Sequence, residues 1–334
     1  MTESGRDARA DTRRRVPRLV SGWSAAIILL IEFAVFTLVL APRDGGPHTF
    51  ANVENGLLIL KYSSIYGIAA IGAAMIIGAG CIDLAPGAII ALVSVVVGHL
   101  FVTSGLPLWW ACTVGLAVGA ACGGLSAGLV VAARLPPFIA TLGVMGIARG
   151  AAFLFTEGRF YDLSSRLPPA ATLLGMPLHL APGAIMLALA LVFHLVMVRT
   201  AHGRHILATG GNELAARYAG VRVGRVKGFV YVTGGLLAAL AGIVLAVVQG
   251  QGKADLATGY ELDIIAAAVV GGASLSGGRA SVIGAVIGSL IFGVLRSALA
   301  QIPGGTFADR FILGIAVLII VVMDRLATGR GDGD

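Results

Sequence analysis

Long apolar runs alternate with short polar segments along most of this 334-residue chain. A helix of about 20 apolar residues crosses the hydrocarbon core of a bilayer, and runs of that length recur too often to fill one soluble core. We expect ten spans, near residues 21–41, 56–80, 83–104, 107–132, 136–156, 179–198, 227–249, 260–276, 281–301 and 307–324. The pattern therefore predicts an all-α membrane protein with about ten transmembrane helices.

Two of these stretches contain glycines and acidic residues, and the first also contains a proline, which predicts broken or re-entrant helices. The interruptions lie at 78–87 and 259–279. Irregular backbone at membrane depth is tolerated only where it is buried in protein or lines a cavity. Hydropathy does not distinguish a full span from a half-helix, and this ambiguity is greatest at 83–104 and 260–276.

Composition also favours lipid as the surrounding solvent. Hydrophobic residues make up 57% of the chain and charged residues 12%, against about 25% charged residues in an ordinary soluble domain. The 48 glycines suit close helix packing in lipid. Cys81, Cys112 and Cys122 lie in apolar surroundings without a CxxC pair, so we interpret them as packing residues and expect no metal site.

The basic residues predict an orientation. The 199–227 connection holds six basic residues and one acid, and residues 1–20 hold six arginines. With the N-terminus inside and ten alternating spans, both segments fall on the cytoplasmic side, as the positive-inside rule requires. We therefore expect a basic cytoplasmic tail at 1–20, a polytopic domain at 21–325 and a cytoplasmic tail at 326–334. Topology thus explains the net charge of +7, and no nucleic-acid partner is expected.

The 199–227 connection also predicts a short cytoplasmic helix. Gly210-Gly211-Asn212 is a turn signal, Asn212 is a natural N-cap, and Glu213 suits the first turn. Residues 214–219 favour helix, and Gly220 is a plausible C-cap. Such a helix either docks in a groove of a partner or lies along the lipid headgroups, and local chemistry gives the two alternatives about equal weight.

The interruption at 78–87 contains the carboxylate of Asp83. Ionisable groups within a membrane are functional candidates, but we favour a role for Asp83 as cap of a helix that begins near Leu84.

Pro136 and Pro137 fit the first turn of the span expected at 136–156. Thr141 either lines a path or bonds back within its own helix, and the second is commoner.

The interruption at 259–279 starts with an acidic and aromatic segment around Asp263, and Ser274 and Ser276 lie among four glycines. The similar contexts of Asp83 and Asp263 hint at the internal repeats that transporters use. No dense cluster of polar and aromatic residues is evident within the spans, so we expect a path that need not bind its solute tightly.

No H-E-x-x-H, G-x-S-x-G or G-x-x-x-x-G-K-[ST] motif occurs in the chain. We therefore expect a transport protein rather than an enzyme. If ATP drives it, the nucleotide must bind another chain.

Four stretches resemble the permease subunits of bacterial ABC importers for monosaccharides, of the ribose/xylose/galactose type. They are Ile82-Asp-Leu-Ala-Pro-Gly87, Leu135-Pro-Pro-Phe-Ile-Ala-Thr-Leu-Gly143 with Arg149-Gly150, Gly210-Gly-Asn-Glu-Leu-Ala-Ala-Arg-Tyr-Ala-Gly220, and Gly259-Tyr-Glu-Leu-Asp263 followed by Gly271-Gly-Ala-Ser-Leu-Ser-Gly-Gly-Arg279. They occur in the family's order over residues 50–325. The chain departs from the family pattern at two places. It has Ala85-Pro86 where the family usually has Ser-Val. The family also commonly reads Gly-Gly-Asn-Pro-Glu-Ala-Ala, whereas here no proline separates Asn212 from Glu213, and Leu214 follows the glutamate.

The resemblance implies a multi-pass protein of the bacterial inner membrane that works by alternating access. Two permease chains, identical or related, would form the path. Cytoplasmic ABC ATPase subunits would bind ATP, and a periplasmic sugar-binding protein would deliver the sugar. The permease itself would need no cofactor.

The resemblance also assigns candidate residues. Those expected at the ATPase contact are Gly211, Asn212, Glu213, Ala216, Arg217 and Gly220. Candidates for the translocation path are Asp83, Phe138, Thr141, Asp263, Ser274 and Ser276.

Two alternatives remain open at this point. The first is a cation-coupled secondary transporter in which Asp83 and Asp263 are the coupling carboxylates. The second is an ABC permease for branched-chain amino acids or another small polar solute. The sequence does not identify the sugar.

Overall fold

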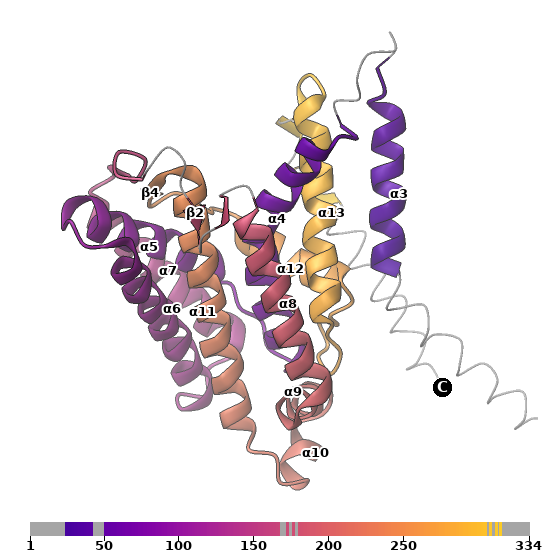
Figure 1. Ribbon diagram of the computed structural model, residues 1–334. Helices are drawn as coiled ribbons and strands as arrows, with labels where there is room; N and C mark the ends of the chain where they lie inside the picture. Colours follow the sequence, from indigo (N-terminus) through magenta and orange to yellow (C-terminus); the bar gives the residue numbers. More distant parts are fainter. Residues whose placement is uncertain are drawn as a thin grey trace, which may run out of the picture.

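The computed structural model describes residues 24–42, 50–167, 172–173, 176–177, 180–305, 307–308, 311–312 and 314–315. The longer helices are α3 (Ser24–Val39), α4 (Val53–Gly78), α5 (Pro86–Gly98), α6 (Leu108–Val131), α7 (Pro137–Thr156), α8 (Ala181–Arg199), α9 (Ala201–Gly211), α11 (Val223–Gln249), α12 (Tyr260–Val270) and α13 (Val282–Gln301). The helix α10 (Glu213–Tyr218) and the π-helical turn η1 (His99–Thr103) are shorter. Figure 1 shows most of the long helices running in roughly one direction, with α9 and α10 at one end of the bundle.

Seven of the described helices are long and apolar enough to cross a membrane, which agrees with an all-α, multi-pass membrane protein. They are α4, α5 with η1, α6, α7, α8, α11 and α13. The predicted count of about ten spans is not confirmed. Within the described residues α3 has 16 residues, and most of the predicted span at 307–324 lies outside them.

The predicted span at 260–276 is a shorter element than expected. The helix α12 has 11 residues and ends at Val270. At 1.5 Å per residue it is about 16 Å long, roughly half the hydrocarbon thickness. Gly272, with φ of 96°, turns the chain after it, a backbone conformation that glycine adopts without strain. This stretch is therefore a half-helix followed by a turn that leads into α13.

The other ambiguous stretch, 83–104, does form a long helix, but it begins later than predicted. The helix starts at Pro86, not near Leu84, and its last turn is η1. Pro86 occupies the first helical turn, where a missing N–H costs little. α7 begins at Pro137 with Pro136 as its N-cap, as the two prolines predict.

The centre of the bundle consists of α4, α5 and α11, most of whose apolar residues are buried within the protein. A helix that is apolar on all sides is buried among other helices or in lipid, and these three are buried among other helices. Gly72 of α4 approaches Gly234 of α11 so closely that a Cβ on Gly72 would lie 3.0 Å from the Gly234 Cα. By contrast, α6, α7 and α8 expose many apolar side chains, as expected for helices that face lipid.

The strand β1 (Phe160–Asp162) pairs with β4 (Gln251–Lys253) in an antiparallel ladder that joins the ends of α7 and α11. A second two-stranded ladder joins β2 (Thr172–Leu173) and β3 (Met176–Pro177). The strands lie at the end of the bundle opposite α9 and α10 (Figure 1). We refer to the two ends as the α10 end and the β1–β4 end.

Candidate functional site

Parts of three segments that are distant in the sequence, 78–80, 210–211 and 277–278, meet in space at the α10 end. Gly210 of α9 packs so tightly that a Cβ there would collide with the Gly78 carbonyl oxygen and lie 2.7 Å from the Gly278 nitrogen. The Gly278 N–H donates to the Gly78 carbonyl at 3.1 Å. A Cβ on Gly80 would lie 3.2 Å from the Gly210 Cα. We call Gly78, Gly80, Gly210, Gly277 and Gly278 the glycine junction.

The structure corrects the prediction of a turn at Gly210-Gly211-Asn212. Gly210 and Gly211 do not form a turn but end α9, a helix that the sequence did not predict. The reason is that glycine is needed at 210 for close backbone approach rather than for a turn conformation. The predicted short helix is therefore not isolated, because only Asn212 separates α9 from α10.

The caps of α10 agree with the sequence prediction. The Asn212 side chain accepts from the Ala215 N–H at 2.9 Å. Gly220 has φ of 83°, its N–H donates to Arg217 O, and the Val221 N–H donates to Ala216 O, both at 3.0 Å. This pair of bonds is a Schellman motif, in which a left-handed glycine ends the helix.

Glu213 attaches α10 to the start of α11. Its carboxylate accepts from the Lys227 ammonium at 2.7 Å and from the Arg217 guanidinium at 2.5 Å. The Lys227 hydrogen bond is the largest cause that lowers the Glu213 pKa below its ordinary value, and Arg217 adds to it. Lys227 was not among the residues predicted for the ATPase contact. Its side chain is 17% exposed, against 39% for Glu213 and 61% for Arg217.

The outer face of α10 is apolar and exposed. Leu214 is 61% exposed and Tyr218 is 84% exposed. Because they are four residues apart, they lie on one face of the helix. A hollow of about 590 Å³ lies beside α10, bounded by the α6–α7 turn at Arg134, by Glu213 and Arg217, and by Lys227 of α11. Ala216 faces inward and is 5% exposed.

Asp83 lies buried just before α5, where neighbouring helices hold its segment. Its Oδ1 accepts from the Ala85 N–H at 2.8 Å, yet the N-cap residue is Ala85 and no side chain caps the helix. Thr141 of α7 accepts from the Leu84 N–H at 3.2 Å and donates to Pro137 O at 3.0 Å. Thr141 thus makes the predicted bond within its own helix and also fixes the segment that precedes α5.

The remaining candidates for the translocation path at this end lie in the turn after α12 and at the start of α7. Ser274 is buried and Ser276 is exposed in the turn after α12, which belongs to the glycine junction through Gly277 and Gly278. Phe138, at the start of α7, is 51% exposed.

Asp263 is separate from this group and pairs with a residue that the sequence analysis missed. Its carboxylate accepts from the Arg296 guanidinium of α13 at 2.8 Å, and both side chains are largely buried. The guanidinium also lies 4.6 Å from the centroid of the Tyr66 ring. The environments of Asp83 and Asp263 therefore differ, which gives no support to the predicted internal repeat.

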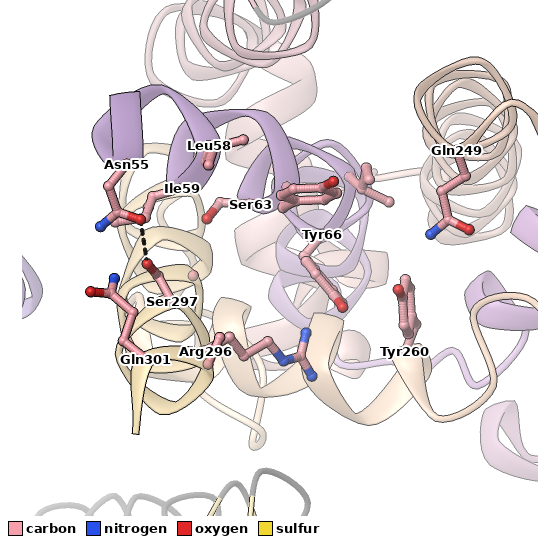
Figure 2. Close-up of a pocket in the computed structure, with 14 residues that line it drawn as sticks. Asn55, Leu58, Ile59, Ser63, Tyr66, Gln249, Tyr260, Arg296, Ser297 and Gln301 are labelled. Atoms are coloured by element: carbon pink, nitrogen blue, oxygen red, sulfur yellow. Dashed lines mark hydrogen bonds between the residues drawn. The ribbon is translucent and has the colours of Figure 1, made fainter. Parts of the chain in front are cut away.

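A cavity of about 360 Å³ lies beside this ion pair, between α4, α12 and α13. Figure 2 shows Tyr66 and Tyr260 next to one another in its wall, with Arg296 beside Tyr66 and with Asn55 and Ser297 further along the cavity. We expected no dense cluster of polar and aromatic residues within the spans, but the fold brings such residues together around this cavity. The residues come from separate helices, so no local pattern in the sequence marks them.

The sequence is similar to known proteins along most of its length. A family model described as "Branched-chain amino acid transport system / permease component" matches residues 55–322. The chain is 34% identical over 306 residues to the ribose import permease protein RbsC of Haemophilus influenzae, covering 90% of this chain and 91% of the relative. It is 36% identical over 296 residues to the RbsC of Bacillus subtilis, covering 87% and 90%.

A third relative carries a different name. The autoinducer 2 import system permease protein LsrC of Photorhabdus luminescens is 30% identical over 304 residues, covering 90% of this chain and 88% of the relative. No solved structure is significantly similar to this chain.

Proposed function

Because this chain belongs to the family of branched-chain amino acid transport system permease components, we propose that it is the membrane subunit of an ABC importer for a ribose-like monosaccharide. The observation that carries this proposal is the position of α10. The helix exposes an apolar face, yet it is tied to α11 by Glu213 and to the bundle by the glycine junction. A partner bound to α10 would therefore move backbone that lies inside the bundle.

In this proposal a cytoplasmic ATPase subunit docks on Leu214 and Tyr218 of α10. Basic side chains surround the docking face, among them Arg134 and Arg217 beside the 590 Å³ hollow. A partner groove with an apolar floor and acidic rim would complement this surface. The partner would bind ATP, so the permease would carry no cofactor of its own. This assignment puts the α10 end on the cytoplasmic side of the inner membrane, and we propose cytoplasmic chain termini from the positive-inside rule.

The mechanism we propose is alternating access. A ligand shifts a conformational equilibrium only through different affinities for the two states. At the α10 end, the ATPase would bind ATP more tightly in one of the two states. At the β1–β4 end, a sugar-loaded periplasmic binding protein would bind one state of the permease more tightly than the other. Asp83 and Thr141 hold the segment that follows Gly80. Ser274 and Ser276 lie in the turn that contains Gly277 and Gly278, so these four candidates for the translocation path adjoin the junction that would transmit the movement. Phe138 remains a candidate at the start of α7. A second permease chain, identical or related, would complete the path.

The sugar assignment follows the names of the relatives, two of which are ribose import permeases. An ABC permease for another small polar solute is the second candidate, because the LsrC relative is named for autoinducer 2 import. A cation-coupled transporter has less support, since Asp263 is already occupied by Arg296.

Uptake of labelled ribose into proteoliposomes tests the proposal. Vesicles would hold the permease together with the ATPase and the sugar-binding protein from the same organism. We expect uptake only when all three proteins and hydrolysable ATP are present, and none with a non-hydrolysable ATP analogue. Uptake by the permease alone under a proton or sodium gradient would overturn the importer assignment.

A further inference from the structure

The cavity between α4, α12 and α13 has features of a ligand site. Its volume of about 360 Å³ lies within the roughly 300–1,000 Å³ of small-molecule pockets. It begins near Asn55, two residues after the start of α4, and extends to Tyr66 at the midpoint of that helix. The cavity therefore reaches from the β1–β4 end to the middle of the bundle, the depth at which transporters commonly bind their solutes.

Three tyrosine rings, Tyr62, Tyr66 and Tyr260, line the cavity. The Tyr66 and Tyr260 centroids are 4.5 Å apart with an angle of 39° between the ring planes. Each ring offers an apolar face and a hydroxyl that both donates and accepts. Such side chains suit a solute with C–H groups on its faces and hydroxyls around its rim.

Two buried side-chain polar atoms in the wall have no hydrogen-bond partner among the residues that the structure describes. They are the Ser63 hydroxyl and the side-chain amide oxygen (Oε1) of Gln301, and Ser63 is fully buried. A buried polar atom without a partner is costly. A ligand hydroxyl that donates to Gln301, or one that pairs with Ser63, would remove that cost.

The charge in the wall is balanced. Among the described residues, Arg296 is the one basic residue that lines the cavity, and the Asp263 carboxylate neutralises its guanidinium at 2.8 Å. The ion pair and the Tyr66 ring hold the guanidinium in place, so its N–H groups are fixed donors. An anionic or zwitterionic solute would find no uncompensated charge here, whereas a neutral polyhydroxylated solute needs none.

We propose that this cavity is a subsite within the permease that holds a neutral monosaccharide during its passage from the binding protein. The inference rests on the proposed importer function. The rings of Tyr66 and Tyr260 contact the faces of the sugar. The Tyr260 hydroxyl contacts the sugar hydroxyls, as do Ser63, Gln301 and Arg296. A lipid chain is the competing occupant, because Leu58 at the rim is 43% exposed, but a lipid chain would leave the polar atoms unsatisfied.

The test measures labelled ribose uptake and ATP hydrolysis in the same proteoliposomes, with saturating sugar-loaded binding protein. The variants are Ser63→Ala and Tyr260→Phe, each of which removes one hydroxyl. The matched control is Ser126→Ala, since Ser126 of α6 is also buried with an unpartnered hydroxyl but does not line the cavity. We expect ribose imported per ATP to fall by about threefold or more in both cavity variants, as the loss of one hydrogen bond implies, and to stay at the wild-type value in the control.

The outcomes separate this inference from the proposed function. If wild-type vesicles import ribose and both cavity variants keep the wild-type ratio, the sugar subsite is overturned and the importer assignment stands. Lipid that co-purifies with the wild type and is lost from the cavity variants, with that ratio unchanged, also overturns the subsite. If the wild type imports no ribose with its partners and ATP, the proposed function fails and the subsite fails with it.

Discussion

At the scale of single residues, Gly210 has room for a hydrogen atom and nothing larger. Its neighbours are backbone atoms of Gly78, Gly80 and Gly278, which cannot move aside as a flexible side chain would. Gly211, one position further along the same helix, is different, because its nearest neighbour would lie 3.8 Å from an added Cβ. The two adjacent glycines therefore form a natural pair for testing the junction.

We predict that Gly210→Ala destabilises the protein and Gly211→Ala does not. Overpacking a tight site costs about 1–3 kcal/mol, whereas Gly211→Ala exchanges glycine for a better helix former. Thermal unfolding of the purified variants in one detergent measures both effects. Equal midpoints for the two variants would contradict the close contact at Gly210.

Local residue roles were predictable, and long-range contacts were not. Asn212 and Gly220 cap α10 as expected, because capping depends on neighbours within a few positions. The bond between Asp263 and Arg296 joins residues 33 positions apart, and periodicity carries no signal for it. The same reason hid Tyr66 and Tyr260, which come from α4 and α12.

At the scale of elements, α10 has six residues and depends on its attachments. An isolated helix of that length is unstable in water. Its attachments are the two caps, the glycine junction at the end of α9, and the bond from Lys227 to Glu213. The last of these joins α10 to α11, so it determines how far the two elements move together.

We predict that Lys227→Met increases amide hydrogen exchange across residues 213–221, because α10 loses its bond to α11. The Glu213 pKa should rise toward its ordinary value of about 4.5, since Lys227 is the largest cause that lowers it. A carboxylate with a lowered pKa stabilises the folded state above its unfolded pKa, and this contribution is lost as pH falls through the folded pKa. The difference between wild type and variant should therefore be complete at pH 7 and disappear in acid.

Arg225→Met is the control for that experiment, because it removes one positive charge from the same helix and leaves the pair of Glu213 and Lys227 intact. We expect wild-type exchange across residues 213–221 in this control. If both variants exchange alike at pH 7, net charge rather than the specific bond holds α10 in place.

At the scale of the whole molecule, hydropathy predicted the fold class and most helix positions. Its limit was the distinction between a span and a half-helix, since α12 is as apolar as its neighbours but ends at Val270. What hydropathy could not indicate is that 78–87, 210–220 and 271–279 meet at one end of the bundle. From that convergence we infer that an ATPase subunit docks on α10 and thereby acts on the interior of the bundle.

Photo-crosslinking tests the docking of the ATPase on α10. A benzophenone amino acid would replace Tyr218, which is 84% exposed on α10, and in a control it would replace Phe160, which is 58% exposed on β1 at the opposite end. After illumination of the complex with its ATPase, we expect a covalent permease–ATPase adduct from position 218 and none from position 160. An adduct from position 160, or none from position 218 in a complex that still co-purifies, would contradict the docking of the ATPase on α10.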